Sequence, residues 1–145
     1  MVANIKETRD KVERYLADLP IKSVVNDKGA VNFRFGSTLV EVSVHEFGKG
    51  RGSTIVRIRA YMNDKVPPSP ELYRHILVER GSFPFGHLDV QEKKDGCFIS
   101  FCHGLFGNSL DFEEFNHAIK AVAITADQID TEIHKKFGGV LFFKD

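Results

Sequence analysis

Between residues 111 and 137, apolar side chains return at alternating steps of three and four positions, the spacing of one face of an α-helix. They are Phe112, Phe115, Ile119, Val122, Ala126, Ile129, Ile133 and Phe137. Asp111 with Glu114 has the pattern of a capping box, and Gly138-Gly139 supplies the stop. About 26 helical residues make a rod about 39 Å long. The pattern therefore predicts one long helix that crosses and covers one face of a sheet.

Before this helix, most of the chain shows the two-residue alternation of β-strands. A first helix opens at Asn4 with Glu7 and ends at Pro20. Four strands are then predicted at 21–25, 30–35, 39–45 and 55–62, with turns at 26–29, 36–37 and 48–52. Alternate side chains of these strands are apolar, so one face of each strand is expected in the core. The four strands predict an antiparallel meander.

The pattern breaks at residues 66–70 and restarts with a short helix, because Pro70 suits the first helical position after a Ser69 cap. This middle helix is expected to end at Gly81. A second hairpin follows, from His87–Glu92 and Cys97–His103. The fold class is α+β, an antiparallel sheet in α-ββββ-α-ββ-α order with the long C-terminal helix across one face.

The strand at 97–102 is apolar on both faces, which predicts that it is central and covered on both sides. The long helix can cover only one face. The other face must therefore meet the middle helix, a second subunit or a ligand.

The domain organisation is predicted to be simple. With 145 residues and no internal repeat, the chain is expected to form a single domain over residues 1–139. Residues 140–145 are expected to be an apolar tail, because Val140-Leu141-Phe142-Phe143 is poorly suited to water. The tail is predicted either to fold back onto the domain or to dock on a neighbour.

Charge and composition then narrow the function classes. Lys plus Arg and Asp plus Glu both number 20, so nothing global favours nucleic acid or an anionic membrane. Zero net charge with 13 Phe favours self-association. The N-terminal residues are charged without an apolar signal-peptide region, and no apolar run approaches about 18 residues. We therefore expect a cytoplasmic oligomer that does not contact a membrane.

Candidate catalytic groups are sparse. None of the six histidines has a second ligand at a metal-binding spacing, although His45, His87 and His103 could converge if their strands were neighbours. Cys97 and Cys102 fall on opposite faces of one strand and are expected to be separate reduced thiols. His103 points away from Cys102 and cannot activate it. An enzyme is the weakest hypothesis, and no catalytic residue, metal or cofactor is predicted.

Candidate binding residues are more numerous. An outward row on the fourth strand combines Arg and Tyr with an apolar residue, as protein interfaces often do. The predicted protein-binding or dimer residues are Ile55, Arg57, Arg59 and Tyr61 of this row, Tyr73, Ile76 and Leu77 of the middle helix, and Phe98. The alternative is a nucleic-acid or phospholigand site formed by Lys49 and Arg51 of the glycine-rich loop with Arg57 and Arg59. A strand follows this loop rather than a helix, and the neutral net charge also argues against nucleic acid.

A family resemblance adds to these patterns. Its residues are Val31-x-Phe33-x-Phe35, Val40-x-Val42-x-Val44, the strand from Ile55 to Met62, the proline-rich entry to the middle helix, Gly86-His87-Leu88-Asp89-Val90 and Asp111-Phe112-Glu113-Glu114-Phe115. In element order over most of the chain, the sequence resembles the YbjN-like, type III secretion chaperone-like family. The tail from Val140 lies outside that pattern.

The resemblance implies a compact α+β domain, commonly a homodimer, that binds other proteins and has no known enzymatic activity. Secretion chaperones of this fold hold an extended effector segment against apolar patches, and the YbjN-like branch is described mostly as regulators. No functional residues carry over, because neither branch defines a motif. We therefore expect a non-enzymatic, homodimeric protein that binds an unidentified protein partner in a chaperone-like or regulatory role.

Overall fold

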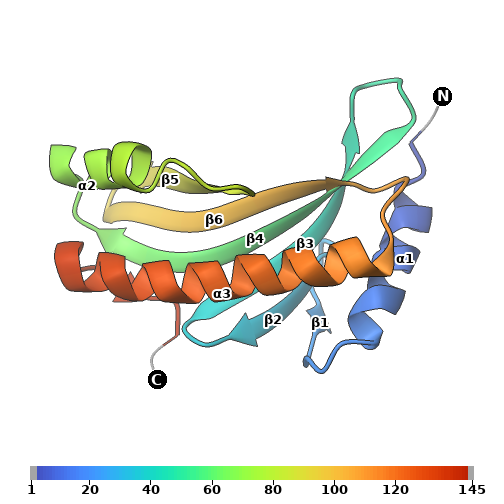
Figure 1. Cartoon of the computed structure of the whole chain (residues 1–145), viewed down its shortest axis with the longest axis horizontal. Helices are drawn as coiled ribbons and strands as arrows, with labels where there is room; N and C mark the ends of the chain where they lie inside the picture. The colour runs from blue at the N-terminus through green and yellow to red at the C-terminus, as the bar shows by residue number, and fades with distance from the viewer. Residues whose placement is uncertain (1–2, 144–145) are drawn as a thin grey trace.

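The computed structural model describes residues 3–143. The helices are α1 (Ile5–Ala17), α2 (Pro70–Arg74), which continues as the π-helical turn η1 (His75–Glu79), and α3 (Phe112–Phe137). The strands are β1 (Val24–Val25), β2 (Val31–Phe35), β3 (Thr38–Phe47), β4 (Ser53–Val66), β5 (His87–Lys93), β6 (Gly96–Phe106) and β7 (Val140–Leu141). Within these residues, all strands join one antiparallel sheet in the order β1-β2-β3-β4-β6-β5, and β7 pairs with β4 (Figure 1).

The predicted fold class and element order are confirmed. The long helix has its predicted ends, since the Asp111 carboxylate accepts a hydrogen bond from the Glu114 amide at 2.8 Å and Gly138 follows the last turn with a φ of 83°. The strands differ mainly in length. The first is reduced to Val24–Val25, because the chain makes a tight turn after Leu19, where the Ile21 amide donates to the Leu19 carbonyl.

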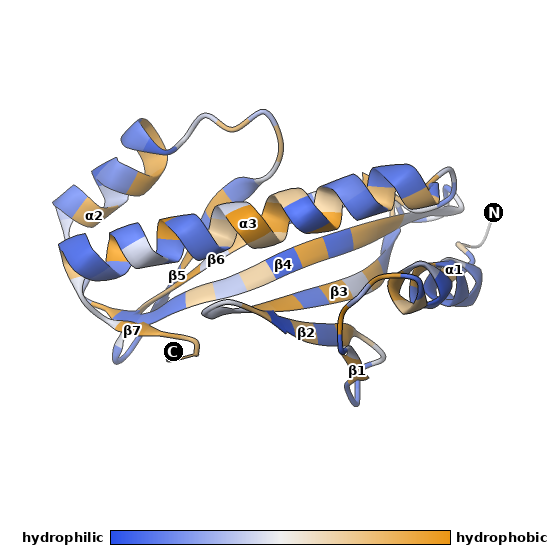
Figure 2. Cartoon of the chain, turned by 60° about the horizontal axis from the view of Figure 1, so that its bottom comes forward, coloured by the Kyte–Doolittle hydropathy of each residue, from blue (hydrophilic) through white to orange (hydrophobic). Residues whose placement is uncertain are grey.

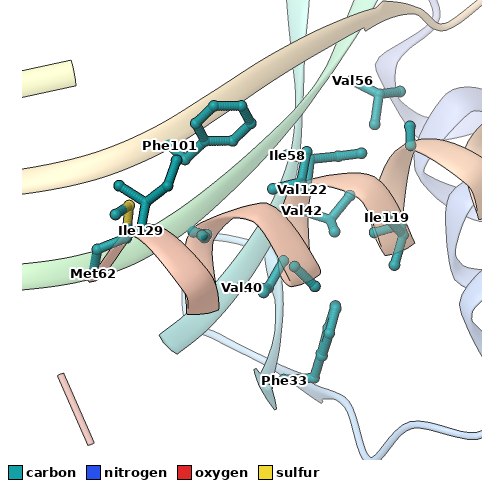
Figure 3. Packing of buried hydrophobic residues seen from close by; sticks show 14 of the residues in the cluster. Phe33, Val40, Val42, Val56, Ile58, Met62, Phe101, Ile119, Val122 and Ile129 are labelled. Atoms are coloured by element: carbon teal, nitrogen blue, oxygen red, sulfur yellow. The ribbon is translucent and has the colours of Figure 1, made fainter. Parts of the chain in front are cut away.

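One hydrophobic core lies between α3 and the sheet. It takes the alternate side chains of a single sheet face, including Val40 and Val42 of β3, Val56, Ile58 and Met62 of β4, and Phe101 of β6. Figure 3 shows these side chains directed toward Ile119, Val122 and Ile129 of α3. The hydropathy colouring of Figure 2 shows apolar and polar stretches alternating along α3 as its faces turn. The apolar stripe read from the sequence is therefore the face that packs on the sheet.

The middle helix lies on the same side of the sheet as α3. Its Leu72 and Ile76 belong to the core, and the His75 ring lies 5.4 Å from the Phe137 ring. The Arg80 guanidinium forms two hydrogen bonds of 3.0 and 2.8 Å with Glu132 of α3. The middle helix therefore does not cover the second face of the sheet. Within residues 3–143, helices cover the strand predicted at 97–102 on one side only, and not on both sides as predicted.

The apolar tail folds back onto the sheet. β7 pairs with the far end of β4, with Leu141 opposite Asn63 and Val140 opposite Asp64. The Phe142 amide donates to the Met62 carbonyl at 3.0 Å. β7 thus occupies the side of β4 that β3 vacates, because pairing between β3 and β4 ends where Leu39 faces Tyr61.

A buried carboxyl group joins α3 to the turn between β2 and β3. Asp130 is fully buried, and the Ser37 hydroxyl lies 2.5 Å from Asp130 Oδ2 and 3.0 Å from Asp127 Oδ1. One hydroxyl hydrogen cannot serve both carboxylates. Burial raises the pKa of Asp130 to about 6, and the charge of Asp127 adds to this, although hydrogen bonds from Ser37 and Thr131 act in the opposite direction. A protonated Asp130 that donates to Ser37, which in turn donates to Asp127, satisfies all three groups.

We predict that Asp130→Asn removes a pH dependence of stability. The folded-state pKa of about 6 lies above the unfolded value of 3.8, so the protonated carboxyl contributes stability that is complete below pH 3.8 and is lost as the pH rises through 6. Asparagine has the hydrogen-bonding pattern of the protonated acid. Between about pH 4.5 and 7.5, the free energy of unfolding should therefore fall by about 2 kcal/mol more in the wild type than in Asp130→Asn.

Urea unfolding at the two pH values measures this difference. Asp27→Asn, which changes an exposed carboxylate in the turn before β2, is the matched control and should follow the wild type. If Asp130→Asn and the wild type show the same pH dependence, Asp130 does not titrate as described.

Candidate protein-binding face of the sheet

The side of the sheet opposite the helices carries a row of side chains on each central strand, and we call it the open face. Its members are Leu39, Glu41, Ser43 and His45 of β3, Ile55, Arg57, Arg59 and Tyr61 of β4, and Phe98, Ser100, Cys102, Gly104 and Phe106 of β6. None of these residues belongs to the hydrophobic core cluster. Within residues 3–143, no helix packs on this face.

Aromatic side chains gather at both ends of the open face. The Tyr61 ring lies 5.5 Å from Phe98 and is stacked at 6.0 Å on Phe142, and we call these three residues the aromatic cluster. Toward the other end, the rings of Phe47 and Phe106 meet edge to face at 5.3 Å. Phe142 is 40% exposed and Phe106 61% exposed. Exposed aromatic surface of this kind is typical of surfaces that bind another molecule.

Polar contacts fix the orientation of side chains between the aromatic groups. The Tyr61 hydroxyl donates to Glu41 at 3.2 Å. Arg59 Nε donates to the Cys102 sulfur at 3.3 Å, and its guanidinium lies 3.8 Å from the Asp89 carboxylate. Burial alone would lower the pKa of Arg59, but hydrogen bonds to Cys102 and Tyr61 outweigh it and the pKa is raised. Arg59 is therefore a charged, tethered side chain.

The structure brings together five of the residues predicted for protein binding. Ile55, Arg57, Arg59 and Tyr61 all lie on the open face, with Phe98 beside Tyr61. Whether they bind a protein stays a prediction.

The three predicted residues of the middle helix lie on the opposite side of the sheet. Ile76 is only 2% exposed in the core, and the Tyr73 hydroxyl donates to Glu92 at 2.6 Å. Leu77 is 73% exposed, and its neighbour Val78 is 61% exposed. This helix therefore offers a separate small apolar surface on η1.

The basic residues of the alternative site are divided: Arg57 and Arg59 line one pocket, and Lys49 and Arg51 are not among its lining residues. Lys49 and Arg51 lie in the exposed loop between β3 and β4. Arg51 and Arg57 are six positions apart, which corresponds to about 20 Å along an extended strand. The loop therefore does not extend the open face into one basic patch.

The strand histidines divide between the two sides of the sheet. His103 faces the helices, opposite Ile58, whereas His45 lies on the open face and His87, opposite Cys102, lies on that same side. Cys97 faces the core and Cys102 the open face, as the alternation predicted. Residues 3–143 contain no group of three histidine, cysteine, aspartate or glutamate side chains arranged to hold a metal ion.

Sequence reasoning missed Arg9, Lys28 and Phe142 as members of this region. Arg9 and Lys28 line a pocket beside the open face, and Phe142 completes the aromatic cluster. They come from α1, a turn and the tail, so no local spacing connects them. The sequence therefore carried no signal that they would meet.

The described residues form an α+β domain with a seven-stranded antiparallel sheet, helices on one side and a half-apolar open face on the other, a surface on which an extended polypeptide can lie. Over residues 6–145 the sequence matches the family of T3SS (YopN, CesT) and YbjN peptide-binding chaperones 1, TY-Chap1, and the chain belongs to this family. The resemblance seen in the sequence is thereby confirmed. The family is a chaperone-like binding domain and is not a known enzyme family.

A solved structure supports the same fold. The chain is similar to YbjN from E. coli, described as a candidate transcription regulator, with a TM-score of 0.65 and 12% identity. The similarity covers 88% of this chain and 91% of YbjN. No curated protein matches the chain. Among the described residues, no helix is both long and apolar enough to cross a membrane.

Proposed function

We propose that this protein is a peptide-binding chaperone that holds an extended, partly apolar segment of another protein across its open face. The observation that carries the proposal is the aromatic cluster, whose rings lie on a sheet face that no helix in residues 3–143 covers. Membership of a peptide-binding chaperone family supports it. The role is binding, and the proposal includes no reaction.

The spacing of the open face suits an extended ligand. Alternate residues of a strand repeat about every 6.6 Å, and alternate residues of an extended peptide have the same repeat. Side chains on one side of the ligand would contact Ile55, Arg57, Arg59 and Tyr61 in turn. β5 also pairs only with β6 among the described strands, so its outer edge is open to a further strand.

We further infer that the protein acts as a homodimer that joins through η1. Leu77 and Val78 are adjacent large apolar side chains that this chain leaves in water. A two-fold axis beside η1 would bury both pairs of side chains against each other. This arrangement leaves the open face of each subunit accessible to a peptide.

The first test uses an unstructured, fluorescein-labelled nine-residue peptide with Leu or Phe at alternate positions and Ser between them. We expect Tyr61→Ala with Phe98→Ala to weaken its binding about tenfold or more, because central aromatic side chains dominate such interfaces. Fluorescence anisotropy gives the dissociation constants, and circular dichroism confirms that the variants are folded.

The matched control is Ile124→Ala. Ile124 is an exposed apolar residue, 47% exposed, and it lies on α3, away from the open face. Its substitution should leave peptide binding unchanged. Equal losses in both variants, or no loss in the double variant, would contradict peptide binding at the aromatic cluster.

For the dimer, we predict that Leu77→Glu converts a wild-type dimer into a monomer, because a carboxylate at the centre of an apolar contact is not solvated. Light scattering coupled to size-exclusion chromatography measures the mass. Ile124→Glu should remain dimeric, and so should a chain ending at Gly139, since the tail lies on the sheet and not on η1. A monomeric wild type, or a Leu77→Glu variant that stays dimeric, would rule out this interface.

A further inference from the structure

A pocket of about 290 Å³ opens beside the open face, and most of the charged side chains that line it are cationic. Arg9, Lys28, Arg57 and Arg59 line it with one carboxylate, Glu41. It lies where β3 continues past β2, because β2 begins at Val31, opposite Val42. Tyr61 also lines it, so the pocket is continuous with the aromatic cluster.

Arg9 reaches the pocket from α1 across the turn before β2. Gly29 has a φ of +78°, and a Cβ there would lie 3.3 Å from Arg9 Cζ, so the absence of a side chain lets the guanidinium approach. Arg9 Nε is buried, and within residues 3–143 it makes no hydrogen bond. A buried, charged donor without an acceptor is costly, and an anion in the pocket would supply one.

The single carboxylate does not neutralise the cations. The two oxygens of Glu41 accept hydrogen bonds from Tyr61 at 3.2 Å and from Asn26 at 3.5 Å. Arg59 is directed to Cys102 and Asp89. Arg9, Lys28 and Arg57 form no ion pair with any carboxylate in the described part of the chain. Three positive charges therefore remain available around one cavity.

The titration of His45 agrees with a positive potential at this site. Burial is the largest cause that lowers the pKa of His45, and the charges of Arg57 and Arg9 lower it further. Glu41 raises this pKa, but the net shift is downward. The lowered pKa of His45 therefore agrees with the presence of unpaired positive charges around the pocket.

We propose that this pocket binds the carboxylate of an aspartate or glutamate in the peptide held on the open face. The inference rests on the proposed peptide-binding function and specifies its ligand. Arg57 and Tyr61 are four residues apart on β4, about 13 Å along an extended strand. A peptide lying along β4 therefore presents its acidic residue to Arg9 and Arg57 when an apolar or aromatic residue four positions away packs on the aromatic cluster.

The surroundings favour a single carboxylate over a nucleic-acid backbone. Glu41 lines the pocket and Asp89 lies on the same side of the sheet, so a chain of phosphates would meet negative charge beyond the first contact. The net charge of the protein is zero. Arginine side chains bind a carboxylate through paired hydrogen bonds, which fits one acidic side chain in a pocket of this size.

The experiment compares three nine-residue peptides that carry Phe at the third position. The first has Glu at the seventh position, the second has Gln there, and the third has the Glu moved to the fifth position. We expect the first to bind the wild type on the order of tenfold more tightly than the second, because hydrogen bonds from arginine are stronger to a carboxylate than to a neutral amide. The third should bind more weakly than the first because its spacing is wrong. Fluorescence anisotropy at 50 and 300 mM NaCl gives the affinities.

Substitutions then assign the preference to the pocket. Arg57→Gln, and separately Arg57→Gln with Arg9→Gln, should reduce the advantage of the glutamate peptide to less than about twofold. Arg14→Gln is the matched control, because Arg14 lies on α1 outside this pocket and its loss changes the net charge equally. It should retain the full advantage.

Each result separates the two proposals. Failure of all three peptides to bind would overturn the proposed function itself. Equal binding of the glutamate and glutamine peptides would overturn the carboxylate pocket and leave peptide binding in place. If a twelve-residue oligothymidine displaces the peptide at lower concentration than the glutamate peptide does, and Arg57→Gln abolishes this, the pocket is a nucleic-acid site and the proposal is wrong.

Discussion

The packing of α3 against β4 is the contact on which the rest of the structure depends. A 26-residue helix lies over a 14-residue strand, and Val122 and Ile58 at their crossing are fully buried. The other helices dock on α3 as well as on the sheet, since Tyr15 of α1 packs against Phe112 and Phe115 while Arg80 binds Glu132. Because α1 and the middle helix both pack against α3, all the helices lie on the same side of the sheet as α3. The open face is a consequence of that arrangement.

An uncovered sheet face has to remain soluble without a ligand and still bind one. Polar groups between the aromatic side chains meet the first requirement, because Arg57, Ser43 and Glu41 interrupt the apolar surface. The tethers of Tyr61 to Glu41 and of Arg59 to Cys102 meet the second. Side chains already held in place lose little conformational entropy when a partner arrives, so more of the contact energy appears as affinity.

The sequence predicted those features that depend on interactions between residues close together in the chain. The caps at Asn4, Asp111 and Gly138 and the alternation along β4 depend on neighbours within a few residues, so the helices and the outward row could be read from the sequence. The layer of the middle helix could not, because an amphipathic pattern shows that a helix has an apolar face and not which surface it meets. That choice depends on contacts made far along the chain, with Leu72 and Ile76 buried in the core and Arg80 bound to Glu132, 52 residues later. The cationic pocket was also out of reach, since Arg9, Lys28 and Arg57 meet only once β2 and β3 have set their register.

The C-terminal tail pairs with the sheet and also completes the aromatic cluster, so its removal changes both the sheet edge and the candidate binding surface. Phe142 supplies one ring of the aromatic cluster, yet the strand that precedes it, β7, is only two residues long. Beyond β7, the amides of Phe142 and Phe143 donate hydrogen bonds to the carbonyls of Met62 and Ser37. Short terminal strands with few bonds open at a lower free energy than the core. A chain ending at Gly139 therefore loses part of the open face, whereas the ion pair between Arg80 and Glu132 of α3 does not involve the deleted residues. Weaker peptide binding by such a chain reports the loss of a contact surface, and the mass of the particle has to be measured separately before the dimer is judged.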